Sequence, residues 1–447
     1  MSEFLWGTAT SAHQVEGHNV HNDWWTFERR FTPSGAACDF VGHLEGDLDR
    51  AAALGTNAFR FSLEWSRVEP RPGERDPDGV DFYSRLVAGC RARGLAPVLT
   101  LSHFTLPRWC EGGWLAPATL DAFERHVAWV AERFGGEVEW FVTVNEPNVM
   151  AGAGYLAGVF PPGHRFRPDL ADRCLEALVR AHGRAYRVLH EIVPRHHGGR
   201  RPKVGIAPHV VAWRPSRLDP LGLTRRIGER FDWAVLDACK TGRLALTWRT
   251  ADVPEAEGTL DFAGLNYYMA LPADAPSFLR FAGLLHRPPG PGTNDLGWPI
   301  EPAGFEEVLV EAHRRLQVPI LVTENGTADA TDRLRPDFLR EHVAALRRAR
   351  ARGADVVGYL HWSLLDNFEW HEGYGPRFGL YAVDYATQAR TPRPSCEVYR
   401  ALIAEGPDDA RGGASRAARG DETDPTRRPQ HSLGRVDEPQ PPKEAFA

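Results

Sequence analysis

Apolar, β-branched runs alternate along the chain with segments whose apolar residues recur at every third or fourth position. Runs bounded by Pro, Gly or polar residues predict buried parallel strands, and the second spacing predicts amphipathic helices. The helical spacing is clear within 120–134 and 339–346. The runs that predict strands are Phe4–Ala12, Asn57–Trp65, Leu95–His103, Glu139–Asn145, Lys203–Trp213, Leu260–Tyr268, Val318–Glu324 and Val356–Leu364.

Eight strands that alternate with helices predict an α/β fold, a single-domain (β/α)8 TIM barrel. We place this domain at residues 1–405. An open doubly wound sheet is the alternative, but no Gly-x-Gly-x-x-Gly turn follows the first predicted strand. Residues 406–447 are rich in Pro, Arg, Asp and Gly and poor in large apolar side chains, so we expect a disordered tail there.

The composition narrows the class of protein. The 447 residues are 43% hydrophobic and 25% charged, which is typical of a globular protein with a sizeable core. A net charge of −6 gives no reason to expect nucleic acid or an anionic membrane as a partner. No apolar run reaches membrane-spanning length, and the N-terminal segment lacks a secretory-signal pattern. Six scattered cysteines predict buried free thiols and hence a reducing, cytoplasmic compartment.

Two glutamates end strand-like runs, where a barrel places its chemistry. Glu146 follows the apolar run 140–144, and Glu324 ends the run that starts at Val318. A buried carboxylate is costly unless it has a partner or a task. For either glutamate alone, a helix cap or an ion pair is the simpler interpretation. Two such carboxylates at C-terminal strand ends predict acid–base or nucleophilic chemistry.

Other predicted strand ends also carry polar or aromatic side chains. In a barrel these ends meet on one face, so their side chains should converge. Such a face suits a small polar ligand that also has a surface for stacking. The residues concerned are Gln14, His103, Asn145, Asn266, Tyr268, Trp362, Glu369 and Trp370.

Five motifs, in the same order along the chain, resemble glycoside hydrolase family 1, the retaining β-glucosidase and β-galactosidase family. The resemblance runs from about Phe4 to Ile403. A shared fold alone would not imply a function, whereas five motifs in register do. The motifs are Phe4–Gly17, Phe59–Arg67, Thr143–Pro147, Thr323–Gly326 and Trp362–Trp370.

The resemblance implies roles for individual residues. Glu146 resembles the general acid/base, and Glu324 resembles the nucleophile that forms a covalent glycosyl-enzyme intermediate. Arg60 and Tyr268 are similar to groups that keep the nucleophile ionised, and Asn266 is a supporting residue. The residues that resemble the sugar-binding set are Gln14, His103, Asn145, Glu369 and Trp370, with Trp362 as the stacking platform.

The implied substrate is a small β-glycoside with a terminal non-reducing β-D-glucosyl group, and β-galactosyl and β-fucosyl groups are further candidates. No metal or cofactor is implied, and oligomeric state is not readable from the sequence. Phe104 and His13 stand where many relatives have Trp and Tyr, which leaves the preferred sugar and aglycone open.

Three alternatives stay open. A 6-phospho-β-glycosidase of the same family typically has serine at the position of Glu369, whose charge here would repel a phosphate. A transglycosylase would share every residue named above. A sugar-binding protein without activity would keep the aromatic residues but lose a catalytic glutamate, and both glutamates are present.

Overall fold

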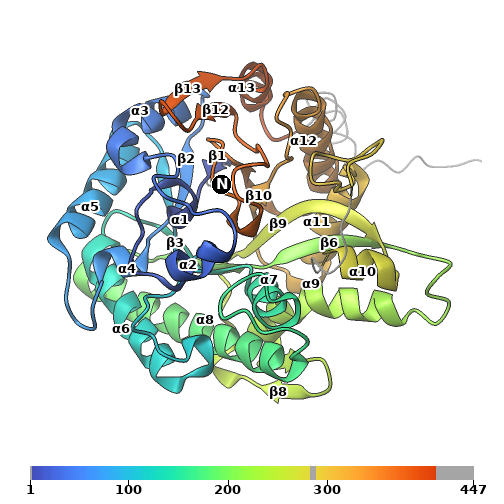
Figure 1. The fold of residues 1–447 in the computed structure, drawn as a ribbon, viewed down its shortest axis with the longest axis horizontal. Helices are drawn as coiled ribbons and strands as arrows, with labels where there is room; N and C mark the ends of the chain where they lie inside the picture. The colour runs from blue at the N-terminus through green and yellow to red at the C-terminus, as the bar shows by residue number, and fades with distance from the viewer. Residues whose placement is uncertain (1–2, 282–287, 409–447) are drawn as a thin grey trace, which may run out of the picture. The chain divides into compact units, whose positions relative to one another are not determined.

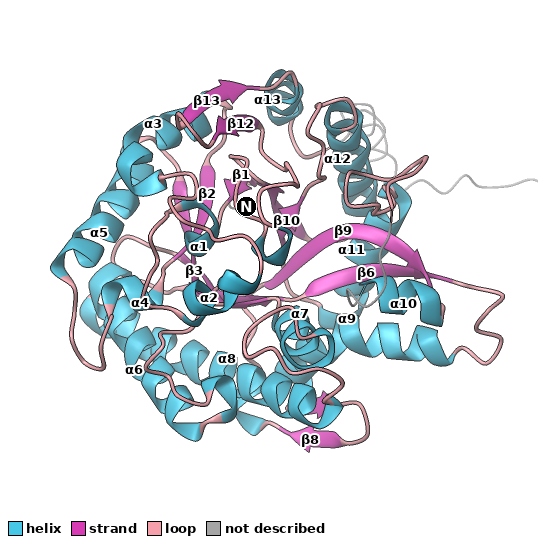
Figure 2. Ribbon diagram, in the orientation of Figure 1, coloured by secondary structure: helices cyan, strands magenta, loops and turns pink. Residues whose placement is uncertain are grey.

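The structure, a computed structural model, describes residues 3–281 and 288–408. A barrel of parallel strands lies at the centre of this region, and helices surround it (Figure 1). In Figure 2 the strands form the magenta inner ring and the helices the cyan outer one. The predicted TIM barrel is therefore confirmed. Most of the predicted tail, residues 409–447, lies outside the described residues, so its disorder stays a prediction, as do the domain limits.

The barrel strands follow one another around a single parallel sheet in the order β5-β4-β3-β2-β1-β11-β10-β9-β6. Their bounds are β1 (Leu5–Ala9), β2 (Ala58–Ser62), β3 (Ala96–Ser102), β4 (Trp140–Asn145), β5 (Lys203–Ala207), β6 (His209–Arg214), β9 (Ala263–Pro272), β10 (Ile320–Asn325) and β11 (Val356–Trp362). Two small antiparallel pairs lie outside this sheet, β7 (Arg243–Ala245) with β8 (Thr250–Asp252), and β12 (Tyr381–Asp384) with β13 (Ala389–Pro392).

The fifth predicted strand, Lys203–Trp213, differs from the prediction because it is broken at Pro208 into β5 and β6. Proline has no N–H to donate to the strand ladder, so pairing is interrupted there. β5 pairs with β4, whereas β6 pairs with β9. The two halves together close the sheet into an eight-stranded barrel.

Helices follow the strands and form the outer layer. The long ones are α3 (Phe40–Ala53), α5 (Pro77–Ala92), α6 (Pro117–Phe134), α8 (Pro168–His196), α9 (Leu223–Thr241), α11 (Pro302–Leu316), α12 (Arg335–Ala351) and α13 (Ser395–Glu405). Shorter helices lie in the connections: α1 (Ala12–Val15), α2 (Asp23–Phe27), α4 (Trp65–Val68), α7 (Pro147–Gly152), the π-helical turn η3 (Ala153–Ala157) and α10 (Ala275–Phe281). Both segments predicted to be helical fall within α6 and α12.

Side chains alternate along the strands between two apolar layers. On β1, Leu5 belongs to a cluster drawn from the strands and the loops that follow them, whereas Trp6 packs with the outer helices. On β4, Val142 belongs to the same cluster as Leu5, whereas Phe141 packs with the outer helices, as Trp6 does. Because successive strand residues point to opposite faces, one face fills the barrel and the other binds the helices. At the C-terminal ends of the strands, the inner face becomes polar.

Both glutamates of interest follow an irregularity in the strand register. The pairing of β4 with β5 shifts between Val142 and Asn145, just before Glu146. The pairing of β10 with β9 shifts between Val322 and Glu324. Such β-bulges re-aim the side chain that follows, and they are common beside active sites. The bulges bring both carboxyl groups to the mouth of the barrel.

Candidate active site

A cavity of about 590 Å³ opens among the side chains at the C-terminal ends of the barrel strands. Arg60 and Asn266, predicted to be supporting residues, are buried beneath its wall and bond to residues that line it. The sequence-predicted residues that line the cavity are Gln14, His103, Asn145, Glu146, Tyr268, Glu324, Trp362, Glu369 and Trp370. The structure thus brings the whole predicted set together.

Glu324 lies between a buried cation and a phenol. Arg60 Nη1 donates to its Oε1 at 2.6 Å, and the Tyr268 hydroxyl donates to its Oε2 at 2.6 Å. Burial raises the pKa of Glu324 to about 7, the ion pair with Arg60 opposes this shift, and the nearby Glu146 adds to it. Both contacts favour the carboxylate form, which is the form a nucleophile needs.

Glu146 contacts an amide and an imidazole instead. Its Oε1 accepts a hydrogen bond from Asn266 Nδ2 at 3.0 Å and lies 3.1 Å from His209 Nδ1. Both of these contacts go to Oε1 and neither goes to Oε2. The residue has φ 43° and ψ 57°, a left-handed conformation that a glutamate adopts at some energetic cost. The strained backbone at Glu146 therefore lowers the stability of the fold, and it sets the direction in which this side chain points.

His209 was not found from the sequence. It is buried at the start of β6, contacts Glu146, and stacks on Tyr268 with ring centroids 5.7 Å apart and an interplanar angle of 9°. The imidazole of His209 thus contacts Glu146 directly, and it also packs on Tyr268, the phenol that binds Glu324. The sequence feature that could have identified His209 is its position, because it is a polar residue directly after Pro208 in an otherwise apolar run.

A chain of hydrogen bonds links the two glutamates beneath the cavity. Arg60 Nη2 donates to Asn145 Oδ1 at 2.7 Å, and Asn266 Nδ2 donates to the same oxygen at 3.0 Å. Thr323 Oγ1 donates to Asn266 Oδ1 at 2.6 Å, which fixes the orientation of that amide. Each amide is thereby held in one orientation, and three side chains, Arg60, Asn145 and Asn266, connect the two carboxyl groups. The positions of both carboxyl groups are set before a ligand binds.

His103 presents a free donor to the cavity. Asn145 Nδ2 donates to its Nε2 at 3.1 Å, so the proton of the neutral ring resides on Nδ1. Burial, reinforced by the Arg60 charge, holds the pKa of His103 well below its usual range, and the ring is neutral. Among the described residues Nδ1 has no hydrogen-bond partner although it is buried. Such an unpaired donor suits a ligand hydroxyl.

Aromatic rings form the adjoining wall. The His103 ring stacks with Trp362 at a centroid distance of 6.0 Å and with Trp370 at 6.2 Å, with interplanar angles of 19° and 13°. Gln14 Nε2 donates to Asn367 Oδ1 at 3.0 Å and to Glu369 Oε2 at 3.3 Å. Flat apolar rings beside convergent polar groups match the two kinds of surface that a pyranose ring presents.

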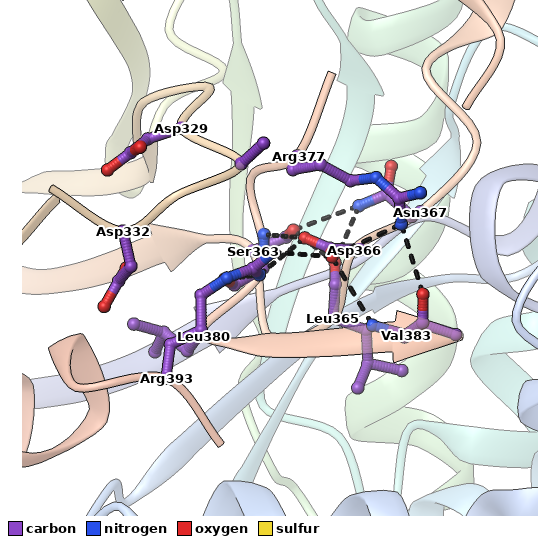
Figure 3. A network of polar contacts seen from close by, with 12 residues as sticks. Asp329, Asp332, Ser363, Leu365, Asp366, Asn367, Arg377, Leu380, Val383 and Arg393 are labelled. Carbon is purple, nitrogen blue, oxygen red and sulfur yellow. Dashed lines mark hydrogen bonds and ion pairs between the residues drawn. The ribbon is translucent and has the colours of Figure 1, made fainter. Parts of the chain in front are cut away.

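The loop that carries Glu369 and Trp370 is held by the network of Figure 3. Asp366 accepts hydrogen bonds from Arg393 at 2.8 and 2.9 Å and from the backbone N–H of Gly379 at 3.0 Å. Arg377 approaches the same carboxylate from the other side. This buried, multiply paired anion fixes the start of the loop. The sequence contained Asp366 within a motif but did not indicate this anchoring role.

The carboxyl group of Glu369 lies in half-buried, acidic surroundings. Burial raises the pKa of Glu369 to about 8, and the neighbouring Glu324 and Glu146 add to the shift. The raised pKa favours the protonated form of Glu369 near neutral pH. A protonated carboxyl group repels a phosphate less than a carboxylate does, so the charge argument against a phosphorylated substrate is weaker at this pH than at alkaline pH.

The raised pKa predicts a pH-dependent gain in stability for Glu369→Gln. The folded state holds the proton up to about pH 8 while the unfolded state releases it near pH 4.5, so the folded state loses stability as pH rises through this window. Glutamine is neutral at every pH. We expect the melting temperature of the variant to exceed that of the wild type by ~2 °C or more at pH 8, and by less at pH 5. Exposed Glu341→Gln is the control. A difference independent of pH would contradict the shift.

Comparisons with known proteins agree with this geometry. The profile of Glycosyl hydrolase family 1 matches residues 1–217 and 230–407. The chain belongs to glycosyl hydrolase family 1. The family 1 relatives include a bifunctional β-D-glucosidase/β-D-fucosidase of Bifidobacterium breve, which is 34% identical over 90% of this chain and 97% of its own. The β-glucosidase A of Thermotoga maritima is 32% identical over 90% of this chain and 96% of its own.

Solved structures of family 1 enzymes share the barrel. A β-glycosidase from Pyrococcus horikoshii superposes with a TM-score of 0.81 and 34% identity, and the match covers 92% of this chain and 96% of that one. The family 1 β-glucosidase from Thermotoga maritima gives a TM-score of 0.82 at 30% identity, over 90% of this chain and 98% of its own. This family 1 member is therefore a β-glucosidase-like O-glycoside hydrolase.

Proposed function

We propose that Glu324 is the nucleophile and Glu146 the acid/base of a retaining β-glycosidase that removes terminal non-reducing β-D-glucosyl groups. The observation that carries the proposal is the contrast between the two carboxyl groups of one cavity. Glu324 is held by a cation and a phenol, whereas Glu146 contacts an amide and an imidazole. Two carboxyls with opposite surroundings suit opposite tasks.

The reaction proceeds by two displacements. The Glu324 carboxylate attacks the anomeric carbon while Glu146 gives its proton to the departing oxygen, which leaves as an alcohol. Glu146, now a carboxylate, then takes a proton from water, and the water oxygen displaces Glu324 from the anomeric carbon. Each step inverts the configuration, so the released sugar keeps the β configuration. Asn266 and His209 on Oε1 hold the Glu146 side chain in place through both steps.

The sugar hydroxyls bind to the polar groups at the base of the cavity. His103 Nδ1–H donates one hydrogen bond, and Gln14 and Glu369 form a polar pair for two adjacent hydroxyls. Trp362 offers its face to the ring carbons. Once the hydroxyls donate to Glu369, its carboxylate form is favoured, because hydrogen bonds to a charged acceptor are stronger than those to a neutral one.

We also propose a cytoplasmic location. The six cysteines are free and buried, which is consistent with a reducing compartment. Within residues 3–281 and 288–408, no helix combines the length and apolarity that crossing a membrane takes. Independence from metals and cofactors stays a prediction from the sequence.

A panel of 4-nitrophenyl glycosides tests the proposed substrate. We expect the highest kcat/KM on the β-glucoside, lower values on the β-galactoside and β-fucoside, and the lowest on the β-mannoside and the 6-phospho-β-glucoside. Proton NMR of the first-formed sugar should show the β anomer. Glu324→Gln, which keeps the shape of the side chain but cannot attack, is the matched control. A first-formed α anomer, or a preference for the phosphorylated glucoside, would contradict the proposal.

A further inference from the structure

The helix that follows Glu146 presents an apolar stripe to the cavity. Its half-buried residues recur at helical spacing over α7 and η3, while Met150 and Tyr155 on the other side are buried in the core. The turn after η3 adds Val159 and Phe160 to the same surface. The residues of the stripe itself are Val149, Gly152, Ala153 and Leu156.

Apolar side chains also line the cavity from other elements. Met269 and Leu271 extend β9 beyond Tyr268, and Phe231 comes from α9. Trp298 packs edge-on against Tyr268, with ring centroids 5.7 Å apart. We call the stripe together with these residues the apolar chamber, which lines the cavity beside Glu146. Its further members are Phe278 and Leu296.

Among the described residues, five polar side chains other than those of the predicted site line the cavity: His209, Arg280, Asp295, His371 and Glu372. His209 already contacts Glu146. Arg280, Asp295 and Glu372 are exposed to solvent. Asp295 also accepts a hydrogen bond from the backbone of the loop after β10, at 2.8 Å. Apart from His209 and the half-buried His371, these side chains are exposed, so they offer few buried partners to the hydroxyls of a second sugar.

We propose that the apolar chamber binds the leaving group and that the enzyme is selective for β-glycosides of hydrophobic alcohols, such as aryl or long alkyl alcohols, over oligosaccharides. The inference rests on the proposed function. Glu146 must protonate the departing oxygen, so the leaving group has to lie against the surface that begins at Glu146. A sugar there would bury several hydroxyls without partners, which costs free energy for each one. An apolar group would gain by the same burial.

The size of the cavity agrees with this occupant. Its volume of about 590 Å³ lies within the range of roughly 300–1,000 Å³ typical of sites that enclose drug-sized ligands. Apolar linings with a few convergent polar groups are the usual composition of such sites. Here most of the convergent polar groups belong to the sugar-binding set, and the apolar chamber forms most of the remaining lining.

A series of alkyl β-glucosides tests the chamber. Ethanol, butanol and hexanol are nearly equal as leaving groups, so differences in kcat/KM report contacts of the chain and not the chemistry. We expect kcat/KM to rise roughly threefold for each added methylene up to hexyl, as burial of apolar surface predicts. Cellobiose should be a poorer substrate than butyl β-glucoside. Hydrolysis of ethyl β-glucoside, whose leaving group makes the fewest contacts with the chamber, reports the proposed function by itself.

Substitutions assign the effect to the chamber. Leu156→Asn should lower the hexyl-to-ethyl ratio of kcat/KM by about tenfold, because a polar group would then face the alkyl chain. Leu120→Asn, at a half-buried leucine of α6 outside the cavity, should leave the ratio unchanged. Should Leu156→Asn not fold, Val159→Thr, which adds a hydroxyl at nearly constant shape, should lower the ratio in the same direction.

The outcomes separate the two proposals. Loss of the chain-length effect in the chamber variant but not in the control would support the inference. Equal kcat/KM on ethyl and hexyl β-glucoside, a higher value on cellobiose, or an unchanged ratio in both chamber variants would overturn it while leaving the β-glucosidase proposal intact. No hydrolysis of any member of the series, including the nitrophenyl glucoside, would overturn the proposed function instead.

Discussion

Glu324→Ala should lower kcat on 4-nitrophenyl β-glucoside by on the order of 10⁴-fold or more, because the covalent step loses its nucleophile. Sodium azide should restore part of the activity, since a small anion fits the space that the carboxylate leaves beside Arg60 and Tyr268. The azide attacks the side of the anomeric carbon that Glu324 attacks in the wild type, and no second displacement follows. The product should therefore be the α-glucosyl azide, which NMR identifies.

The control for this experiment is Glu341→Ala, an exposed glutamate on α12. It should keep both the activity and the melting temperature of the wild type. A Glu324→Ala protein that melts normally and retains near-normal turnover without azide would show that Glu324 is not the nucleophile. A rescued product with the β configuration would contradict the proposed geometry of attack.

The fold could be predicted from the sequence because barrel strands are buried on both faces and read as continuous apolar runs. Each of the eight predicted runs overlaps a barrel strand, although β6, β9 and β10 extend one to four residues beyond the runs. The break at Pro208 could have been foreseen from the missing N–H, but not which neighbour each half would pair with. Pairing depends on closure of the whole barrel, which no local pattern contains.

The site was predictable to the extent that its residues lie in motifs at strand ends. His209 was missed because its role depends on contact with Glu146, 63 positions away, and on stacking with Tyr268. The apolar chamber was missed for a different reason. Its residues come from α7, η3 and the turn after it, β9, α9, α10 and the loop before α11, and apolar residues in helices and strands ordinarily predict core packing. Only the exposure of one helix face to the cavity distinguishes them.

The three-carboxyl cluster also lay beyond the sequence. Each of Glu146, Glu324 and Glu369 was found separately, but the effect of one on the protonation of another depends on their burial in one cavity. Burial raises the pKa of Glu324 to about 7 and that of Glu369 to about 8, with mutual repulsion in each case. Both shifts favour the protonated forms, so the cluster carries less negative charge than three isolated carboxyl groups would carry at the same pH.

Glu146→Ala should produce a loss that depends on the leaving group. With an alkyl β-glucoside, whose alkoxide is a poor leaving group, the first displacement should slow by about 10²–10⁴-fold, because no acid protonates the oxygen. With 2,4-dinitrophenyl β-glucoside, which needs no protonation, that step should change by less than about tenfold. Stopped-flow measurement of the first turnover separates the two cases. An equal slowing of the first step for both substrates would remove Glu146 from the acid role.

The second displacement gives the same variant a distinct signature. Without Glu146 as a base, water attacks slowly, so the glycosyl-enzyme on Glu324 should accumulate and dinitrophenol should appear in a burst followed by a slow steady state. Azide needs no base, so it should speed the steady state of Glu146→Ala. In this variant azide displaces Glu324 after one inversion has already occurred, and the product should be the β-glucosyl azide. The same anion thus gives opposite anomers in the two variants only if Glu324 attacks and Glu146 transfers the proton, and identical anomers would contradict that assignment.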